Sequence, residues 1–501
     1  MISCPKMDTH RQSEPHMFQF DTTYARLPNA FSARVTPAQV PKPELITFNS
    51  DLARQLGAQD TNQSDTQLAE IFSGQRLLPG SEPIAMAYAG HQFGNFVPQL
   101  GDGRALLLGE VVDPAGHRFD IQLKGSGRTP FSRNGDGKAP LGPVLREYIV
   151  SEALHHLGMP TTRSLAAVKT GETVRRETPL PGAILTRVAS SHIRVGTFEY
   201  FAFQKDVDNL RRLTEYSIHR HYPEIQNDSQ ASLQFFRKVG EAQVELVTGW
   251  MALGFIHGVM NTDNMSIAGE SIDFGPCAFM DQFRFDQVFS SIDQFGRYGY
   301  SNQAQITLWN LSRFGNCLLL MHQDASEDEL RKWNQELEAL QDLFEHRHTA
   351  KMLEKLGIFD NERPNDRELI QKWLRYLEAE HLDYTLSFRA LASLVDPEAD
   401  WGSFKKTKAF QEFYRFWQER IHQQGLQAWE IQERMNQVNP VVIPRNHKIE
   451  EIIDAGRKGD FSPFHEMNEV LRNPFQEQET FSSYQSAPTP EETVQATFCG
   501  T

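Results

Sequence analysis

The sequence predicts an α+β fold, in which a small β-rich lobe comes first and a large helical lobe follows. Strand patterns lie in the first half of the chain, helical patterns dominate beyond Ser301, and we find no internal repeat. Strands followed by helices are typical of α+β proteins. With 501 residues, the chain can form two or three lobes, because single cores stop growing at roughly 250–300 residues.

The composition is that of a globular protein with an acidic balance. Hydrophobic residues make up 39% and charged residues 23% of the chain, and the net charge is −15. Binding to nucleic acid or to anionic membranes needs a basic face, so we expect neither as a partner. Any phosphate site must therefore be a local basic pocket. A monomer is the expected oligomeric state.

Neither a membrane span nor a targeting segment is expected. The uncharged run 247–260 is shorter than the roughly 20 apolar residues that span a bilayer, so it is predicted to be a buried helix. Residues 1–20 mix charges without an apolar signal core, which predicts a cytoplasmic location. The four cysteines, at positions 4, 277, 317 and 499, match no zinc spacing or disulfide framework.

The first strongly patterned segment is a β-hairpin, which follows a polar stretch (59–67) that is predicted as a loop or exposed cap. Residues 105–112 form an apolar run, and Asp-Pro-Ala-Gly at 113–116 is typical of a turn. Apolar and polar residues then alternate from 119 to 124. The alternation predicts a half-buried strand that ends with Lys124 on its polar face.

Helices are predicted from the spacing of apolar residues. Residues 143–157 have this spacing, with Glu147 in the first half, and Gly158 stops the helix. Longer helical patterns cover residues 232–255, 326–356 and 401–435. The polar tail from about residue 476 is predicted to be mobile.

The most informative stretch is the loop 257–264 with the turn Asp273-Phe274-Gly275 that follows. The loop reads H-G-V-M-N-T-D-N and resembles the H-R-D-L-x-x-x-N loop of protein kinases, and the turn matches their D-F-G. Val259 occupies the position of the kinase base, and valine cannot accept a proton. The nearest carboxylate is Asp263. We therefore predict a protein-kinase-like bilobal fold that binds a metal nucleotide without ordinary kinase chemistry.

Upstream residues follow the order of a kinase nucleotide-binding lobe. A glycine turn at 101–104 precedes the hairpin, Lys124 ends the second strand, and Glu147 on the next helix can pair with this lysine. Each feature has an ordinary alternative. Gly-Asp-Gly is a common tight turn, a strand-end lysine is usually solvated, and Glu152 competes as the partner. Their order along the chain favours the nucleotide site.

Three further groups are candidates for phosphate or metal binding. The glycine-rich insert 125–138 has several basic residues, although a flexible loop is the alternative. Arg187 and Arg194 have guanidinium forks that suit phosphate oxygens, although each arginine taken singly is more often structural. Asn264 and Asp273 supply the oxygen ligands that Mg²⁺ prefers when it also binds phosphates.

These features divide the chain into four predicted parts. Residues 1–80 form an N-terminal extension that packs on the kinase-like core, and residues 81–200 form the nucleotide-binding N-lobe. Residues 201–475 form the helical C-lobe with the catalytic loop and the metal site. Residues 476–501 form the mobile C-terminal tail.

Two strings, residues 87–94 (A-Y-A-G-H-Q-F-G) and residues 257–265, closely resemble the selenoprotein O family, also known as the YdiU family. The resemblance extends from about Phe18 to the C-terminus. It implies a pseudokinase that binds ATP in a flipped orientation and transfers AMP to Ser, Thr or Tyr hydroxyls of proteins. Transfer of UMP from UTP with Mn²⁺ is also attributed to bacterial members.

Carried over by motif, the resemblance assigns roles to individual residues. It implies that Asp263 is the proton acceptor, that Asn264 and Asp273 hold Mg²⁺ or Mn²⁺, and that Lys124 keeps an ion pair with Glu147. Asp273 and Glu147 thereby belong to the nucleotide site. The other nucleotide contacts that it implies are Gly101, Gly103, Arg104, Lys124, Asp136, Gly137, Arg187 and Arg194.

The C-terminus departs from the eukaryotic members, which have selenocysteine there, because this chain has Cys499. The family resemblance suggests redox control by a bridge from this tail to a cysteine of the activation segment, which here is the loop 287–291. The loop 287–291 has no cysteine, so only Cys277 or Cys317 could be the partner, and we do not expect this regulation.

Two alternatives to AMP transfer stay open. A true phosphotransferase would use Asp263 as an unusually placed base, and an inactive scaffold would bind the nucleotide without transferring any part of it. The choice between ATP and UTP, the choice between Mg²⁺ and Mn²⁺, and the identity of the protein substrates stay open as well.

Overall fold

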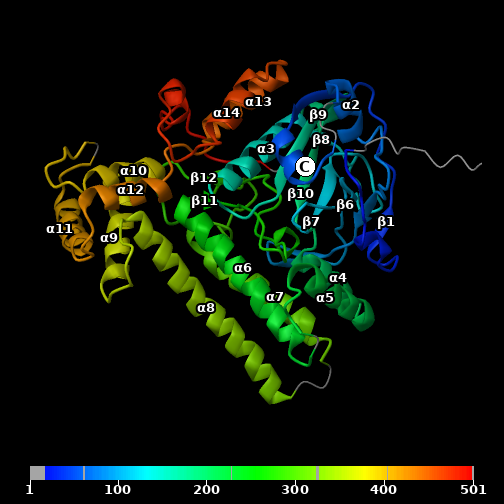
Figure 1. The fold of residues 1–501 in the computed structure, drawn as a ribbon, viewed down its shortest axis with the longest axis horizontal. Helices are drawn as coiled ribbons and strands as arrows, with labels where there is room; N and C mark the ends of the chain where they lie inside the picture. The colour runs from blue at the N-terminus through cyan, green and yellow to red at the C-terminus, as the bar shows by residue number, and fades with distance from the viewer. Residues whose placement is uncertain (1–16, 60–62, 227, 323–325, 403, 499–501) are drawn as a thin grey trace, which may run out of the picture.

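The computed structural model describes residues 17–59, 63–226, 228–322, 326–402 and 404–498, and Figure 1 shows their arrangement. Most strands lie before residue 190, and helices dominate the rest of the chain. The predicted α+β class is therefore confirmed at this level, as a β-sheet region followed by a helical region. The division into four parts stays a prediction.

One antiparallel sheet forms the frame of the N-terminal region. In the described part of the chain it has eight strands, in the order β1-β3-β6-β7-β10-β9-β2, with β8 paired to β10. β1 and β2 lie at the two ends of this order, so residues before 80 complete both edges of the sheet. The strands are β1 (Ser32–Arg34), β2 (Glu44–Phe48), β3 (Ile84–Met86), β6 (Ala105–Val112), β7 (Arg118–Lys124), β8 (Ala139–Pro140), β9 (Arg163–Arg175) and β10 (Pro179–Ala189).

Two short ribbons lie outside this sheet. One pairs β4 (Gly90–Gln92) with β5 (Asn95–Val97), and the other pairs β11 (Phe255–Ile256) with β12 (Ala278–Phe279). The second ribbon holds the two ends of the segment that contains the kinase-like loop and turn.

The predicted hairpin is present as β6 and β7, with Ala105 opposite Lys124 in the register. The prediction of a half-buried strand is wrong, because the polar residues of β7 are buried as well. Gln122 is 0% exposed and Lys124 is 8% exposed. Both make hydrogen bonds to charged side chains on neighbouring elements, and these bonds replace water.

Helices cover both faces of the sheet. α1 (Ser50–Gln55) and α2 (Asp65–Phe72) pack on one face, over a core that includes Leu123. α3 (Leu141–His156) covers β9 and β10 on the other face and agrees with the predicted helix. The late helices α13 (Asn446–Arg457) and α14 (Ser462–Val470) pack against α3, as Figure 1 shows.

The helical region is built around α6 (Ala231–Leu253) and α8 (Glu327–Lys355), which lie side by side in Figure 1. Both agree closely with the predicted ranges. In the described ranges, no helix combines the length and the apolar character that crossing a bilayer requires. The remaining helices are α4 (Val195–Phe203), α5 (Val207–His221), α7 (Gln303–Leu319), α9 (Asp366–Ala379), α10 (Tyr384–Ser393), α11 (Lys408–His422) and α12 (Ala428–Val438).

Two local predictions need correction. The helical pattern over 401–435 forms two helices, α11 and α12, because Gly425 adopts a φ of +72° between them. The polar stretch 59–67 is not only a loop, since α2 begins at Asp65. Ser64 and Gln67 form a capping box that starts this helix.

The end of the described chain docks beside the turn that follows Asp273. Thr497 N donates to Phe289 O at 2.7 Å, and Thr497 Oγ1 donates to Pro276 O at 2.5 Å. The mobility of the whole tail stays a prediction. Cys277 and Cys317 are buried and are not bonded to each other, while Cys4 and Cys499 lie outside the described residues.

Candidate nucleotide-binding site

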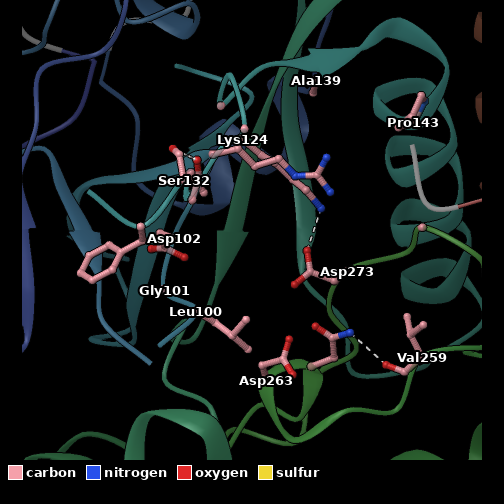
Figure 2. Close-up of a pocket in the computed structure, with 18 of the residues that line it drawn as sticks. Leu100, Gly101, Asp102, Lys124, Ser132, Ala139, Pro143, Val259, Asp263 and Asp273 are labelled. Carbon is pink, nitrogen blue, oxygen red and sulfur yellow. Dashed lines mark hydrogen bonds and ion pairs between the residues drawn. The ribbon is translucent and has the colours of Figure 1, made fainter. Parts of the chain in front are cut away.

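A cavity of about 460 Å³ lies between the sheet and the 257–275 segment, and Figure 2 shows part of its lining. Its basic side chains outnumber its acidic ones, although the chain has a net charge of −15. Such a cavity attracts an anionic ligand. The basic lining residues are Arg104, Lys124, Arg133, Lys138, Arg176, Arg187 and Arg194, and the acidic ones are Asp102, Asp136, Glu147, Asp263 and Asp273.

Asp273 forms ion pairs with three cationic side chains on one wall of the cavity, which we call the inner wall. Its Oδ1 lies 2.7 Å from Lys124 Nζ and 2.8 Å from Arg187 Nη1, and its Oδ2 lies 2.9 Å from Arg194 Nη1. Burial opposes ionisation of Asp273, but these positive charges outweigh it and hold the pKa of Asp273 well below its usual range. The ion pairs also hold Asp273 in a left-handed conformation, with a φ of +65°.

The predicted ion pair between Lys124 and Glu147 is confirmed. Glu147 Oε2 lies 2.6 Å from Lys124 Nζ, and Glu147 Oε1 lies 3.2 Å from Arg187 Nη1. Glu152, the competing candidate, pairs with Arg163 at 2.8 Å instead. α3 therefore supplies one carboxylate that restrains two of the cations.

Neighbouring strands hold Lys124 and Arg187 side by side. Lys124 ends β7, and Arg187 lies on β10, opposite Gln122 of β7 in the antiparallel register. Gln122 Oε1 accepts hydrogen bonds from Arg187 Nε at 3.1 Å and from Arg187 Nη2 at 2.6 Å. The neutral amide of Gln122 thus holds Nε and Nη2 of the guanidinium, while Nη1 faces Asp273.

Arg194 is held at the beginning of α4 by contacts with three parts of the chain. Its guanidinium carbon lies 4.6 Å from the centroid of the Tyr88 ring, within cation–π distance. Its Nη1 donates to the backbone oxygen of Asp263 at 2.8 Å. Arg194 therefore connects the two carboxylate positions of the cavity, because the same nitrogen also faces Asp273.

Asp263 lies in the 3₁₀ turn Thr262–Asn264 (Figure 2). Its carboxylate makes no ion pair with Lys124, Arg187 or Arg194, which we call the cation cluster. Its Oδ2 accepts a hydrogen bond from Gln92 Nε2 at 3.1 Å, and its buried Oδ1 has no hydrogen-bond partner among the described residues. Burial raises the pKa of Asp263, while Gln92 and Arg194 lower it. The effect of burial is the larger one, so the pKa is about 6. A carboxylate in such a place can accept a proton from a bound hydroxyl.

The space around Asp263 depends on a glycine. A Cβ atom at Gly90 of β4 would lie 2.5 Å from Asp263 Oδ1. Any side chain at this position would therefore push against the carboxylate. The β4–β5 ribbon thus both supplies Gln92 and leaves room for the group that Gln92 orients.

Val259 occupies the position of the kinase base and is buried, at 5% exposed. Its carbonyl oxygen accepts a hydrogen bond from Asn264 Nδ2 at 2.9 Å. Because the nitrogen of the Asn264 amide is used in this bond, the amide oxygen is the atom left for a cation.

Asn264 and Asp273 suit a divalent cation when phosphate is bound with it. Both line the cavity, and their oxygens are ligands that Mg²⁺ and Mn²⁺ accept. Asp273 already faces three cationic side chains, so another cation there needs the negative charge of a polyphosphate. A carboxylate has about four lone-pair sites, so Asp273 retains one. In the described part of the chain, no cluster of three or more His, Cys, Asp or Glu residues could hold a metal by itself.

The glycine turn makes room for the basic insert. Gly101 has a φ of +74°, and a Cβ atom there would lie 2.3 Å from the Phe131 ring. At Gly103 a Cβ atom would lie 2.9 Å from Phe131 O. Close packing against Phe131 therefore explains why both positions are glycine. Their contact with phosphate stays a prediction.

The insert 125–138 closes on itself at its base. Gly127 N donates to Gly137 O at 3.1 Å, and a Cβ atom at Gly137 would lie 2.1 Å from Gly127 O. Asp136 accepts two hydrogen bonds from Arg176, at 2.9 and 3.1 Å, which lower the pKa of Asp136. The closed loop holds its basic residues at the cavity.

All residues predicted for the site line this one cavity, and their contacts with a nucleotide or a metal stay predictions. Two further residues, Gln92 and Gln122, were missed. Gln122 lies two residues before Lys124 on the same strand face, so the alternation could have identified it. Gln92 lies within the string 87–94, where no local pattern relates it to Asp263. Tyr88, Asp102 and Arg176 line the cavity as well.

Comparisons with known proteins identify the family of this chain. A family described as protein adenylyltransferase SelO matches residues 16–472. The protein nucleotidyltransferase YdiU of Nitrobacter winogradskyi is 52% identical over 486 residues, which cover 96% of each chain. That of Bradyrhizobium diazoefficiens is 52% identical over 489 residues, 97% of this chain and 99% of the relative. That of Agrobacterium fabrum is 50% identical over 488 residues, 97% and 100% of the two chains.

These matches identify a transferase that acts on a nucleotide. The matches extend over nearly the whole chain, well beyond the cavity residues. The chain belongs to the SelO family of protein adenylyltransferases, whose relatives are the YdiU protein nucleotidyltransferases.

Proposed function

We propose that this protein transfers AMP from ATP to serine, threonine or tyrosine hydroxyls of proteins and releases pyrophosphate. One observation carries the proposal. Buried Val259 occupies the position of the kinase base, while Asp263 places a carboxylate at the same cavity. A kinase mechanism needs a base at the first of these positions. The name of the family, protein adenylyltransferase, agrees with AMP transfer.

A protein-kinase-like bilobal fold is part of the proposal. The sheet with Lys124, the helix with Glu147 and the later loop with Asp273 follow the kinase order along the chain. The Lys124–Glu147 distance of 2.6 Å supports the same arrangement. In this proposal, residues 81–200 form the nucleotide-binding lobe and residues 201–475 form the helical lobe.

ATP is proposed to bind with its terminal phosphates toward the cation cluster. Lys124, Arg187 and Arg194 lie together on the inner wall, where their charges suit the β- and γ-phosphates. The basic insert adds charge from the side of the glycine turn. The α-phosphorus then faces the part of the cavity where Asp263 lies and where an acceptor hydroxyl can enter.

In the proposed reaction, the acceptor oxygen attacks the α-phosphorus and forms a new P–O bond. The bond from the α-phosphorus to the oxygen that bridges to the β-phosphate breaks, and pyrophosphate leaves with that oxygen and the bonding electron pair. The hydroxyl proton passes to the carboxylate of Asp263. Gln92 orients the carboxylate through Oδ2, and the cation cluster stabilises the charge on the leaving pyrophosphate.

Asn264 and Asp273 are proposed to hold Mg²⁺ or Mn²⁺ together with ATP. The cation, when bound, neutralises charge on the phosphate oxygens. Asp273 has a second task that depends only on the protein. It balances the positive charges of Lys124, Arg187 and Arg194 and so keeps them together before the nucleotide arrives.

Incubation of the purified protein with ATP labelled at the α- or the γ-phosphate tests the proposal. We expect α label in the acceptor protein, no γ label, and one pyrophosphate released for each AMP transferred. Incorporation of γ label alone would identify a phosphotransferase, and nucleotide binding without incorporation would identify a scaffold. α-Labelled UTP with Mn²⁺, in parallel, measures UMP transfer by the same site.

A further inference from the structure

A second cavity, of about 540 Å³, adjoins the nucleotide cavity and shares two lining residues with it, Phe93 and Ile292. We call it the 292–309 cavity. Its walls come from the β4–β5 turn, from the irregular segment before the 3₁₀ turn Tyr300–Asn302, and from the first half of α7. Its lining residues are Phe93, Asn95, Ile292, Asp293, Gln294, Phe295, Arg297, Asn302, Gln305, Ile306 and Trp309.

Apolar side chains stand exposed at this cavity. Phe295 is 96% exposed, the highest value among the large apolar side chains of the described residues, and Ile292 is 57% exposed. Exposed apolar groups beside a cavity indicate an interaction site. The nucleotide is unsuited to this surface, because its phosphates require the charges of the neighbouring cavity.

The exposed Phe295 lies on a fixed turn. Asp293 Oδ1 accepts a hydrogen bond from Arg297 N at 2.9 Å, and Asp293 Oδ2 accepts one from Tyr298 N at 2.7 Å. Gly296 supports the turn with a φ of +64°. A side chain on such a turn is presented to a partner without a large ordering cost.

The polar lining suits a polypeptide backbone. Asn95, Gln294 and Gln305 are exposed carboxamides, which both donate and accept hydrogen bonds. Arg297 lies with its guanidinium carbon 4.7 Å from the centroid of the Trp309 ring. Arginine and aromatic side chains are enriched where proteins bind one another. The occupant that fits is therefore an extended segment with an apolar side chain.

Hydrogen bonds connect this cavity to the loop that contains Asp263. Tyr298 Oη donates to Asn261 Oδ1 at 2.6 Å and accepts from Phe93 N at 3.0 Å. Asn261 lies two residues before Asp263, and Phe93 follows Gln92, the residue that donates to Asp263. A segment bound in the 292–309 cavity would thus lie against the elements that hold the proton acceptor.

We infer that the 292–309 cavity binds the polypeptide segment that flanks the acceptor hydroxyl and takes an apolar side chain of that segment against Ile292 and Phe295. This inference rests on the proposed function and specifies its substrate. Acceptor sites would lie in unfolded or extended segments, with an apolar residue at a fixed offset from the serine, threonine or tyrosine.

The test measures AMP transfer from α-labelled ATP to a peptide library with one central Ser, Thr or Tyr and one fixed residue at each flanking position. We expect the wild type to prefer an apolar residue at one offset. Phe295→Ala, which lies outside the nucleotide cavity, should raise KM for the best peptide by about tenfold, with kcat and KM for ATP unchanged. The double variant Ile292→Ala/Phe295→Ala should raise the peptide KM further. Phe416→Ala, an exposed phenylalanine on α11, is the matched control and should behave as the wild type.

Several results would overturn the inference. One is an unchanged peptide KM in both variants, and another is a library without positional preference. A dimer in sedimentation velocity that dissociates on Phe295→Ala, with peptide KM unchanged, would assign the surface to a second copy of the chain. Absence of α label with every acceptor would instead remove the proposed function itself.

Discussion

Asp263 and Asp273 are carboxylates at one cavity, ten residues apart in the chain, yet their environments shift their pKa values in opposite directions. Asp273 contacts Lys124, Arg187 and Arg194, which hold its pKa well below the usual range against the effect of burial. Among the described residues, Asp263 has one amide donor, Gln92, and one oxygen without a hydrogen-bond partner, and burial raises its pKa to about 6. The number of cationic partners thus distinguishes the proposed binding carboxylate, Asp273, from the proposed proton acceptor, Asp263.

The comparison predicts the largest effect for Asp273→Asn. Removing this carboxylate leaves Glu147 as the acid shared by Lys124 and Arg187 and leaves Arg194 with Asp102 at 3.9 Å, so the free energy of unfolding should fall by about 3–5 kcal/mol. AMP transfer should fall by about 10³-fold. Denaturant unfolding and transfer of α label measure the two effects.

Asp281→Asn is the control for this variant, because Asp281 pairs with Arg445 outside the cavity. We expect it to lower stability while the folded fraction transfers AMP at the wild-type rate. Equal loss of transfer in both variants would mean that Asp273 acts through stability alone.

Lys124→Met should have the next largest effect. The substitution keeps most of the side-chain length but removes the charge that faces both Glu147 and Asp273. Transfer should fall by about 10²-fold, with an unchanged circular dichroism spectrum. Lys169→Met removes a lysine that pairs with Glu44 on the same sheet, outside the cavity, and should leave transfer unchanged. Wild-type turnover by Lys124→Met would remove this lysine from the site.

The pH dependence of stability should distinguish the two carboxylates in protein free of metal and nucleotide. The pKa of Asp263 is raised from 3.8 to about 6 on folding. Its stabilising contribution is therefore present below about pH 4 and lost as the pH rises through 6. Asp273 has the opposite sign, because its contribution is lost as the pH falls below about 4.

Asp263→Asn should consequently be more stable than the wild type at pH 7 by up to about 2–3 kcal/mol, and not at pH 4. Urea unfolding of both proteins at the two pH values measures this difference. A variant that is less stable at pH 7 would contradict the raised pKa of Asp263.

Gln92→Met should have the smallest effect. It removes the donor to Asp263 Oδ2 and keeps the side-chain length, so kcat should fall about fivefold, the value of one ordinary hydrogen bond of ~1 kcal/mol. KM for ATP should stay the same. Gln99→Met, at an exposed position, is the matched control. A fall of several hundredfold would indicate that Gln92 contacts the substrates directly.

Local patterns predicted the elements that bear the site but not their burial. The alternation in residues 119–124 identified the strand and its end at Lys124. It also indicated a solvated polar face, and this was wrong because Arg187 of β10 and Glu147 of α3 cover that face. These partners come from other elements, and a period-2 pattern carries no information about them.

The kinase-like order of motifs predicted which residues would gather at the cavity, since order along the chain fixes the topology. It could not predict the partner of Asp263. Gln92 is 171 positions away and approaches only because the β4–β5 ribbon folds over the 3₁₀ turn. The 401–435 pattern failed for a local reason, since a single glycine interrupts a helical periodicity that is otherwise continuous.

The most direct test of the central claim is a paired measurement on Asp263→Asn, namely AMP transfer and the Kd of a nonhydrolysable ATP analogue. Because Asp263 is proposed to accept a proton and not to hold the phosphates, transfer should fall by about 10³-fold. The Kd should stay the same or decrease, since one negative charge leaves the cavity. Transfer at the wild-type rate, or loss of analogue binding as large as that in Asp273→Asn, would contradict the account.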